Sequence, residues 1–147
     1  MLVVEDEPAL LKLVSTILQN YGYTIFQASN GVEALKIWKR RRDEIDLLVT
    51  DMVMPEGVSG LELAEGLRSD RPELKVLYTS GYSADVTGDD LELNEGVNFI
   101  AKPYHPSALA RAIRRCLGGE ADCPSSTGEI PLYVRRPARY EFARRFP

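Results

Sequence analysis

The stretch that decides the fold is residues 47–55, LLVTDMVMP. From Leu47 to Thr50 the run shows no alternation of apolar and polar positions, which is typical of a strand covered by helices on both faces of a parallel sheet. An acidic residue, Asp51, follows that run directly. Because reactive groups in such sheets gather at the carboxyl ends of the strands, Asp51 is the first candidate for a functional residue.

Four further apolar runs predict strands on either side of this one. They are Leu2–Val4, Thr24–Ala28, Val76–Thr79 and Phe99–Ala101. Amphipathic stretches with helical spacing separate them and predict helices at residues 8–20, 30–42, 60–69, 84–95 and 106–117. The stretch 84–95 has the weakest periodicity and contains Gly88. Strict alternation of five strands and five helices, (βα)5, predicts a flavodoxin-like three-layer α/β/α sandwich with a five-stranded parallel sheet.

Composition places the chain among ordinary globular proteins. Its 147 residues are 44% hydrophobic and 27% charged, with a net charge of −4. The negative balance lies in residues 1–118, which we expect to form one domain, and an acidic domain argues against nucleic acid as a direct partner. Residues 119–147 have no helical periodicity and are predicted to be a linker and tail that is flexible or partly ordered.

Targeting signals and cysteine spacing add little evidence about the function of the chain. No apolar run approaches the roughly 18 residues needed to span a bilayer, and no signal peptide precedes the first strand, so we expect a soluble, cytoplasmic domain. Cys116 and Cys123 fit no recognised metal-site spacing, and we expect both to be reduced thiols.

Polar residues suited to phosphate and cation chemistry follow four of the five predicted strands. Glu5 and Asp6 follow the first strand, Asp51 the third, Ser80 the fourth and Lys102 the fifth. A hard divalent cation relieves the repulsion among clustered carboxylates, and it neutralises charge on an incoming phosphoryl group. Asp51 can then act as an oxygen nucleophile and form an aspartyl phosphate.

These residues carry a resemblance to a known family. The segments VVEDEP at 3–8, VTDMVMP at 49–55, SGY at 80–82 and KP at 102–103 resemble response regulator receiver domains of two-component signalling, over residues 1 to about 118. The resemblance implies Mg²⁺, or Mn²⁺, bound by Asp6, Asp51 and the backbone carbonyl of Val53, with Glu5 acting through water. It assigns Asp51 as phosphoacceptor, Lys102 as the family's invariant lysine, and Ser80 and Phe99 as the switch residues.

The resemblance also implies partners. Asp51 would take phosphate from a sensor histidine kinase or a histidine phosphotransfer protein, with no enzymatic activity beyond self-phosphorylation and slow autodephosphorylation. The segment 74–83 is similar to receivers fused behind hybrid sensor histidine kinases. A stand-alone regulator and a non-phosphorylated docking module are the alternatives. The last two helices, within residues 84–117, would form the output face and could pair two copies in a homodimer.

Three departures from the family pattern stand out. The loop 54–60 is one residue longer than usual, which could alter access to Asp51. Val53 and Tyr82 flank the expected path of attacking water, and an apolar Val53 predicts slow autodephosphorylation. The first strand begins at the chain start, so the sequence is expected to be excised from a longer protein.

Other functional classes fit the residues less well. A phosphohydrolase of the haloacid dehalogenase type needs a second aspartate two residues after the nucleophile, and Val53 occupies that position. No glycine-rich nucleotide-binding loop follows a strand. His105 is interpreted as an incidental loop residue, and the basic run 39–42 as a solvated helix end.

Overall fold

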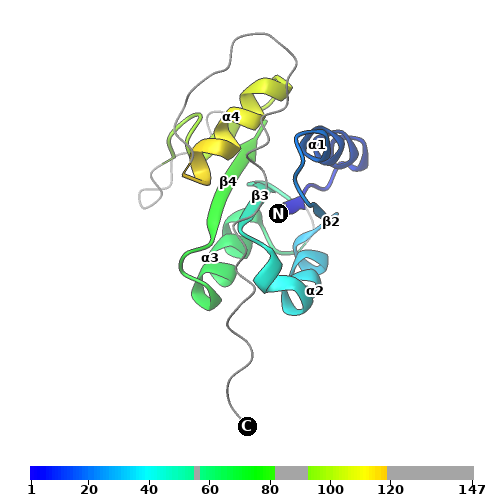
Figure 1. Ribbon diagram of the computed structural model, residues 1–147. Coiled ribbons are helices and arrows are strands. Elements are labelled where there is room, and N and C mark those ends of the chain that lie inside the picture. Colours follow the sequence, from blue (N-terminus) through cyan, green and yellow to red (C-terminus); the bar gives the residue numbers. More distant parts are fainter. Residues whose placement is uncertain (55–56, 82–92, 119–147) are drawn as a thin grey trace.

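A computed structural model describes residues 1–54, 57–81 and 93–118 of the chain. In these residues five strands alternate with helices, and Figure 1 shows their arrangement. The elements are β1 (Leu2–Val4), α1 (Pro8–Asn20), β2 (Phe26–Ala28), α2 (Gly31–Arg41), the short 3-10 helix η1 (Arg42–Glu44), β3 (Leu47–Asp51), α3 (Gly60–Asp70), β4 (Lys75–Ser80), β5 (Phe99–Ala101) and α4 (Pro106–Cys116).

All five strands lie parallel in one sheet with the order β2-β1-β3-β4-β5. The strand β3 pairs with β1 on one side and β4 on the other, as its unbroken apolar run predicts. All five of its residues are buried. The chain leaves β1 for β2 on one side and returns to β3 on the other, so the topological switch point lies between β1 and β3.

Helices cover both faces of the sheet and make three layers. In Figure 1, α1 and α4 lie on one side of the strands and α2 and α3 on the other. Alternate residues of β1 divide between the two cores: Val3 packs with α1 and α4, whereas Leu2 and Val4 pack with α2 and α3. The predicted α/β/α sandwich is therefore confirmed.

The helix starts on the α2 and α3 side have side-chain caps. Asn30 accepts a hydrogen bond from the backbone N–H of Glu33 at the start of α2. Ser59 and Glu62 form a reciprocal capping box at the start of α3. Both caps satisfy backbone donors that the first turn of a helix leaves free, and they fix where each helix begins.

Some predicted features differ from the structure or lie outside it. The strand β2 begins at Phe26 rather than Thr24, because the Thr24 carbonyl accepts a bond from the amino group of Met1 while the Phe26 N–H starts the pairing. The predicted helix at 84–95 falls mainly on residues 82–92, which lie outside the described residues. This segment includes Tyr82, and the described residues 93–95 are not helical. The predicted tail 119–147, including Cys123, also lies outside them, and Cys116 is a free thiol.

None of the helices in the described ranges has both the length and the apolar character needed to cross a membrane.

Candidate functional site

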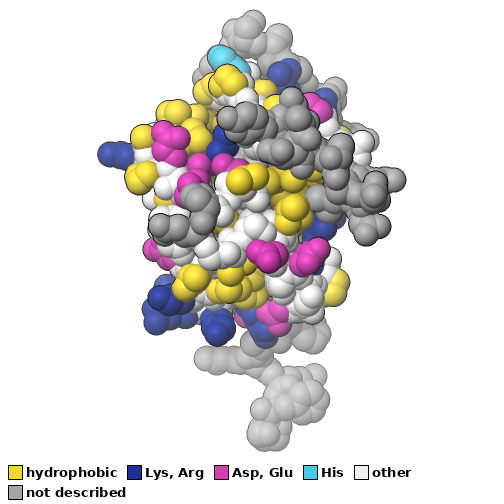
Figure 2. Space-filling view, turned by 180° about the vertical axis from the view of Figure 1, so that it is seen from behind, with side chains coloured by type: hydrophobic (Ala, Val, Ile, Leu, Met, Phe, Trp, Pro, Cys, Tyr) yellow, Lys and Arg dark blue, Asp and Glu magenta, His cyan; other side chains and the backbone are white. Residues whose placement is uncertain are grey.

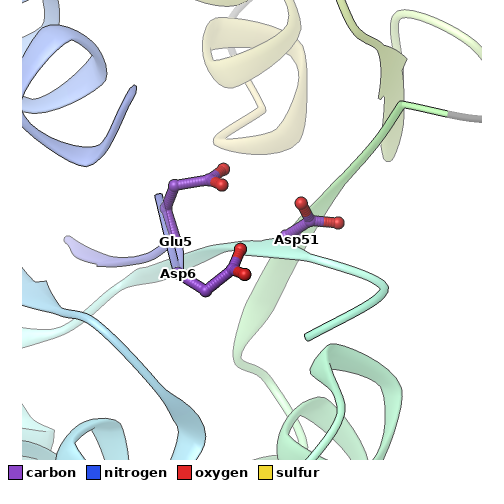
Figure 3. A group of neighbouring side chains, drawn as sticks. All are labelled: Glu5, Asp6 and Asp51. Carbon is purple, nitrogen blue, oxygen red and sulfur yellow. The ribbon is translucent and has the colours of Figure 1, made fainter. Parts of the chain in front are cut away.

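Three carboxylates converge at the carboxyl ends of β1 and β3 (Figure 3). Glu5 and Asp6 directly follow β1, and Asp51 is the last residue of β3. The register pairs Val4 with Thr50, so the residues that follow on the two strands come side by side. One oxygen from each carboxylate lies within 4.8 Å of the others. Asp6 is exposed, whereas Glu5 and Asp51 are buried, so the group opens to solvent on one side only.

Lys102 connects two of these carboxylates. Its Nζ donates to Asp51 Oδ2 at 2.5 Å and to Glu5 Oε2 at 2.7 Å. Lys102 directly follows β5, two strands away from β3, and its side chain crosses the end of β4 to reach them. Its backbone N–H donates to the Ser80 carbonyl at 2.7 Å, and the peptide bond to Pro103 is cis.

Burial controls the electrostatics of this group. Burial raises the pKa of Glu5, although the hydrogen bond from Lys102 opposes the change. For Lys102, burial lowers the pKa, but the hydrogen bonds to Asp51 and Glu5 outweigh it and the net shift is upward. The lysine therefore stays charged at neutral pH and offsets part of the repulsion between the two buried carboxylates.

The backbone after β3 holds Asp51 in place. The Val53 N–H donates to Asp51 Oδ1 at 3.1 Å, so each carboxylate oxygen of Asp51 has a partner. The Met52 N–H donates to the Thr79 carbonyl at 2.9 Å, and the Met52 carbonyl accepts from the Gly60 N–H at 3.2 Å. The segment 51–53 is thus fastened to β4 on one side and to α3 on the other.

The remaining predicted site residues lie at different distances from this group. Ser80 is the last residue of β4, the strand between β3 and β5, and it is buried at the same edge of the sheet. Phe99 is buried on β5 and packs in the core on the α2 and α3 side. Val53 is 58% exposed. His105 is the exposed N-cap of α4, where its Nδ1 accepts from the Ser107 N–H.

The sequence did not predict a role for two residues near the site. Gly60, the first residue of α3, lies against the Asp51 carbonyl, and only a close backbone approach in the structure reveals this. Tyr104 follows Lys102 by two positions and packs into the α1 and α4 core. Burial raises the Tyr104 pKa, and the negative charges of Glu5 and Asp51 raise it further.

The donor set suits a hard divalent cation. Carboxylate oxygens are the ligands that Mg²⁺ prefers, and opposite ligands in its octahedral shell lie about 4.2 Å apart. The three carboxylate oxygens lie within 4.8 Å of one another, which is close enough for one cation to interact with all of them, directly or through water. The site can therefore combine a divalent cation, a nucleophilic carboxylate and an ammonium group.

Comparison with known proteins finds relatives over most of the chain. Residues 1–114 match the response regulator receiver domain family. The chain is 37% identical over 116 residues to the sensor kinase CckA of Brucella abortus, which covers 79% of this chain but only 12% of the kinase. It is 28% identical over 116 residues to the response regulator receiver protein CpdR of the same organism, covering 79% of this chain and 94% of CpdR.

A solved structure gives the same result. The crystal structure of the receiver domain from the hybrid histidine kinase CckA superimposes with a TM-score of 0.65 at 33% sequence identity. The match covers 79% of this chain and 96% of that domain. The chain is therefore similar both to a receiver that belongs to a long kinase and to a receiver protein of which the match covers almost the whole length.

Proposed function

The chain belongs to the response regulator receiver domain family, and we propose from that premise that Asp51 is its phosphoacceptor. The observation that carries the proposal is the contact of Lys102 with Asp51 and Glu5, which joins the ends of β1, β3 and β5 in one buried group. A buried carboxylate with an ammonium at 2.5 Å, beside two further carboxylates, supports phosphoryl transfer to an aspartate, because it places a nucleophile next to a positive charge and a possible cation site.

In the proposed reaction, Asp51 attacks the phosphorus of a phosphohistidine on a partner protein. A bond forms between a carboxylate oxygen and phosphorus, while the bond from phosphorus to the donor's imidazole nitrogen breaks and its electron pair stays on that ring. Lys102 is placed to stabilise the charge on the transferring phosphoryl oxygens, because its Nζ already contacts the nucleophile. Ser80 would donate its hydroxyl to a phosphoryl oxygen after transfer.

Three groups would bind the cation directly and a fourth through water. Asp6 and Asp51 would bind Mg²⁺ through their carboxylates, Val53 through its backbone carbonyl, and Glu5 through a water molecule. When bound, the ion neutralises charge on the phosphoryl oxygens. The exposed Asp6 supports this assignment, because it offers a ligand on the side of the group that is open to solvent.

Two settings for the domain fit the relatives, and we favour the hybrid kinase. The 37% identity to the CckA kinase exceeds the 28% identity to CpdR. The donor would then be a sensor histidine kinase or a histidine phosphotransfer protein. A stand-alone regulator is the second candidate, which the 94% coverage of CpdR supports.

The output face would include β5 and α4. A groove of about 470 Å³ lies between them, and Ala101, Pro103 and Tyr104, which flank Lys102, line part of it. A change at Asp51 would move Lys102 and, through its chain neighbours, the wall of this groove. Phe99 lies on β5, the strand that directly precedes Lys102, and its side chain would change position as well. Two copies of the domain could pair through this face.

The phosphoryl group on Asp51 would be hydrolysed slowly. Val53, two positions after Asp51, is apolar and exposed, and its side chain offers no hydrogen bond to orient an attacking water. A phosphorylated lifetime of only seconds at neutral pH would contradict this part of the proposal.

The test of the function is the intact mass of the protein after incubation with Mg²⁺ and acetyl phosphate. Wild-type protein should gain about 80 Da, the mass of one phosphoryl group on a carboxylate. The Asp51→Asn variant should gain nothing, and Asp46→Asn, which changes an exposed aspartate before β3, should behave as wild type. No adduct on the wild type, or an adduct on Asp51→Asn, would overturn the assignment.

A further inference from the structure

The first residue of α3 lies directly against the phosphoacceptor's backbone. The Gly60 N–H donates to the Met52 carbonyl at 3.2 Å. A Cβ added to Gly60 would overlap the Asp51 carbonyl oxygen and would lie 2.8 Å from the Asp51 carbonyl carbon and 2.9 Å from Thr50 Oγ1. Only a glycine therefore permits this approach of α3 to β3.

Neither α3 nor β3 can move away from this contact easily. The capping box of Ser59 and Glu62 fixes the first turn of α3, and its buried face packs into the core through Leu63 and Leu67, each 1% exposed. On the other side, β3 is paired with both β1 and β4, and Thr50 Oγ1 donates to the Asp51 carbonyl at 3.0 Å. A side chain at position 60 must therefore displace the end of β3, where the pairing stops.

We infer that Gly60 is a positioning residue for the phosphorylation site. Through the contact with Asp51 and the bond to Met52, it sets the backbone path of residues 51–53. That path carries the Asp51 carboxylate and the Val53 carbonyl, both of which we assign to the cation. The inference rests on the proposed function, and it adds that the geometry of two ligands depends on a residue that touches neither phosphate nor metal.

Two other glycines provide matched controls. At Gly31, the first residue of α2, an added Cβ would lie 2.7 Å from Val58 Cβ and 2.8 Å from the Val58 carbonyl oxygen, so it is also crowded. Its neighbour is the loop before α3, and Asp51 is not among its closest contacts. Gly66, inside α3, has no atom within 4 Å of an added Cβ.

The experiment compares Gly60→Ala, Gly31→Ala and Gly66→Ala in the full chain. Three quantities are measured: urea unfolding, Mg²⁺ affinity by calorimetry, and the initial rate of phosphorylation by acetyl phosphate at saturating Mg²⁺. Amide chemical shifts of residues 51–53 without metal supply a readout that is independent of activity. Gly66→Ala is also introduced into the other two variants, because an alanine inside a helix raises stability and keeps them folded.

We expect both crowded variants to lose stability, but only Gly60→Ala to shift the amides of residues 51–53. Its Mg²⁺ affinity and phosphorylation rate should each fall about 10- to 100-fold, as displacements near 1 Å do at reacting groups. Wild-type affinity and rate in folded Gly60→Ala would overturn the inference. Equal losses in Gly31→Ala would overturn it as well, because the effect would then be general loosening.

The design separates this inference from the proposed function. If the wild type binds Mg²⁺ but is not phosphorylated, the proposed function fails, and the Mg²⁺ affinities of the three variants still decide the role of Gly60. If the wild type binds no Mg²⁺, the inference fails with the metal site. Should Gly60→Ala unfold even with Gly66→Ala, an osmolyte that is excluded from protein surfaces restores the compact state for the binding measurement.

Discussion

The two ends of the sheet both hold ion pairs, but they bury them to different degrees. At the carboxyl end, the side chains of Lys102, Glu5 and Asp51 are 16%, 5% and 11% exposed. At the amino end, where β3 and β4 begin, Arg42 and Asp70 form a pair whose side chains are 55% and 44% exposed. Both ends pair a basic side chain with a carboxylate, and they differ in how much water reaches the pair.

This difference in burial distinguishes the proposed phosphorylation site from the ion pairs at the other end of the sheet. Exposed ion pairs contribute little to stability because water screens them. Buried charges lose their hydration, and their mutual attraction often fails to repay that loss. A buried cluster of two carboxylates and a lysine is therefore weak evidence of a stabilising role, and it fits the proposed site because perturbed groups cluster at active sites.

The amino end has a clear structural task. Trp38 is buried, and its indole N–H donates to Asp70 Oδ2 at 2.8 Å, which ties α2 to α3. Arg71 donates to the carbonyls of Arg42 and Ile45 at 2.9 and 2.8 Å. The basic residues at the end of α2 suit the negative end of its helix dipole. In Figure 2, basic side chains gather at the lower left of the face shown, apart from an acidic group at the upper left.

The largest expected effect comes from removing the cation at the carboxyl end. Lys102→Met keeps an apolar stem but takes the ammonium from Asp51 and Glu5. Phosphorylation by acetyl phosphate should fall about 10²- to 10³-fold, as it does when one electrostatic group is removed from an active site. Initial rates by intact mass measure this. Lys75→Met, which changes an exposed lysine at the amino end, should keep the wild-type rate.

At the amino end, the expected effect is on stability alone. Trp38→Phe removes the bond to Asp70 and leaves part of a buried volume empty, so the free energy of unfolding should fall by about 1–2 kcal/mol. Urea denaturation followed by circular dichroism measures it, since the chain has one tryptophan and the variant loses that fluorescence. A phosphorylation rate that fell in folded Trp38→Phe would break the division between the two ends.

The comparison also shows how much the sequence could predict. The sheet follows from the unbroken apolar run of β3 together with its alternation with helical stretches, because strands buried on both faces of a parallel sheet have that pattern. The convergence of Glu5, Asp6 and Asp51 follows from parallel pairing, because residues just after neighbouring strands share one edge. These predictions depend on local pattern and on topology, both of which a single sequence contains.

Contacts between elements could not be predicted in the same way. The approach of Gly60 to Asp51 depends on the height at which α3 sits over β3, and no periodicity encodes that height. The bond between Trp38 and Asp70 joins two helix ends that are 32 residues apart. A tryptophan on an apolar helix face predicts burial, but its polar partner appears only once the helices are packed.

A third prediction concerns pH. Burial raises the pKa of Glu5 above its ordinary value of 4.5, so the folded protein binds more protons than the unfolded chain from about pH 4.5 upward through the folded pKa. The stability that Glu5 contributes is therefore lost as pH rises through that window. Glu5→Gln should gain stability relative to wild type as pH rises from 4 to 8, because an amide does not ionise.

The control for this prediction is Glu33→Gln. Backbone and side-chain hydrogen bonds from Ser29 lower the pKa of Glu33, so its contribution is present above the ordinary value of 4.5 and is lost as pH falls. The two variants should change the pH profile of the unfolding free energy in opposite directions. Parallel profiles would show that burial does not govern Glu5.

The smallest expected effect concerns the difference between buried polar groups that have a hydrogen-bond partner and one that has none. At the carboxyl end, buried Glu5 and Asp51 both have bonds. On α1, the Ser15 side chain is fully buried, and its Oγ is the buried side-chain oxygen that lacks a partner within the described residues. Ser15→Ala removes that unpaired hydroxyl and improves helix propensity, so the free energy of unfolding should rise by up to about 1 kcal/mol.

Urea denaturation and the phosphorylation rate together decide this case. Thr16→Ala is the matched control, because its exposed hydroxyl donates to the Lys12 carbonyl at 2.8 Å and no buried group is relieved by its loss. If Ser15→Ala gains stability and keeps the wild-type rate, the unpaired hydroxyl is a packing defect of α1. If it loses both stability and rate, a buried polar group far from the carboxylates contributes to the reaction. Burial with a hydrogen-bonded partner would then not distinguish the proposed site from the rest of the molecule.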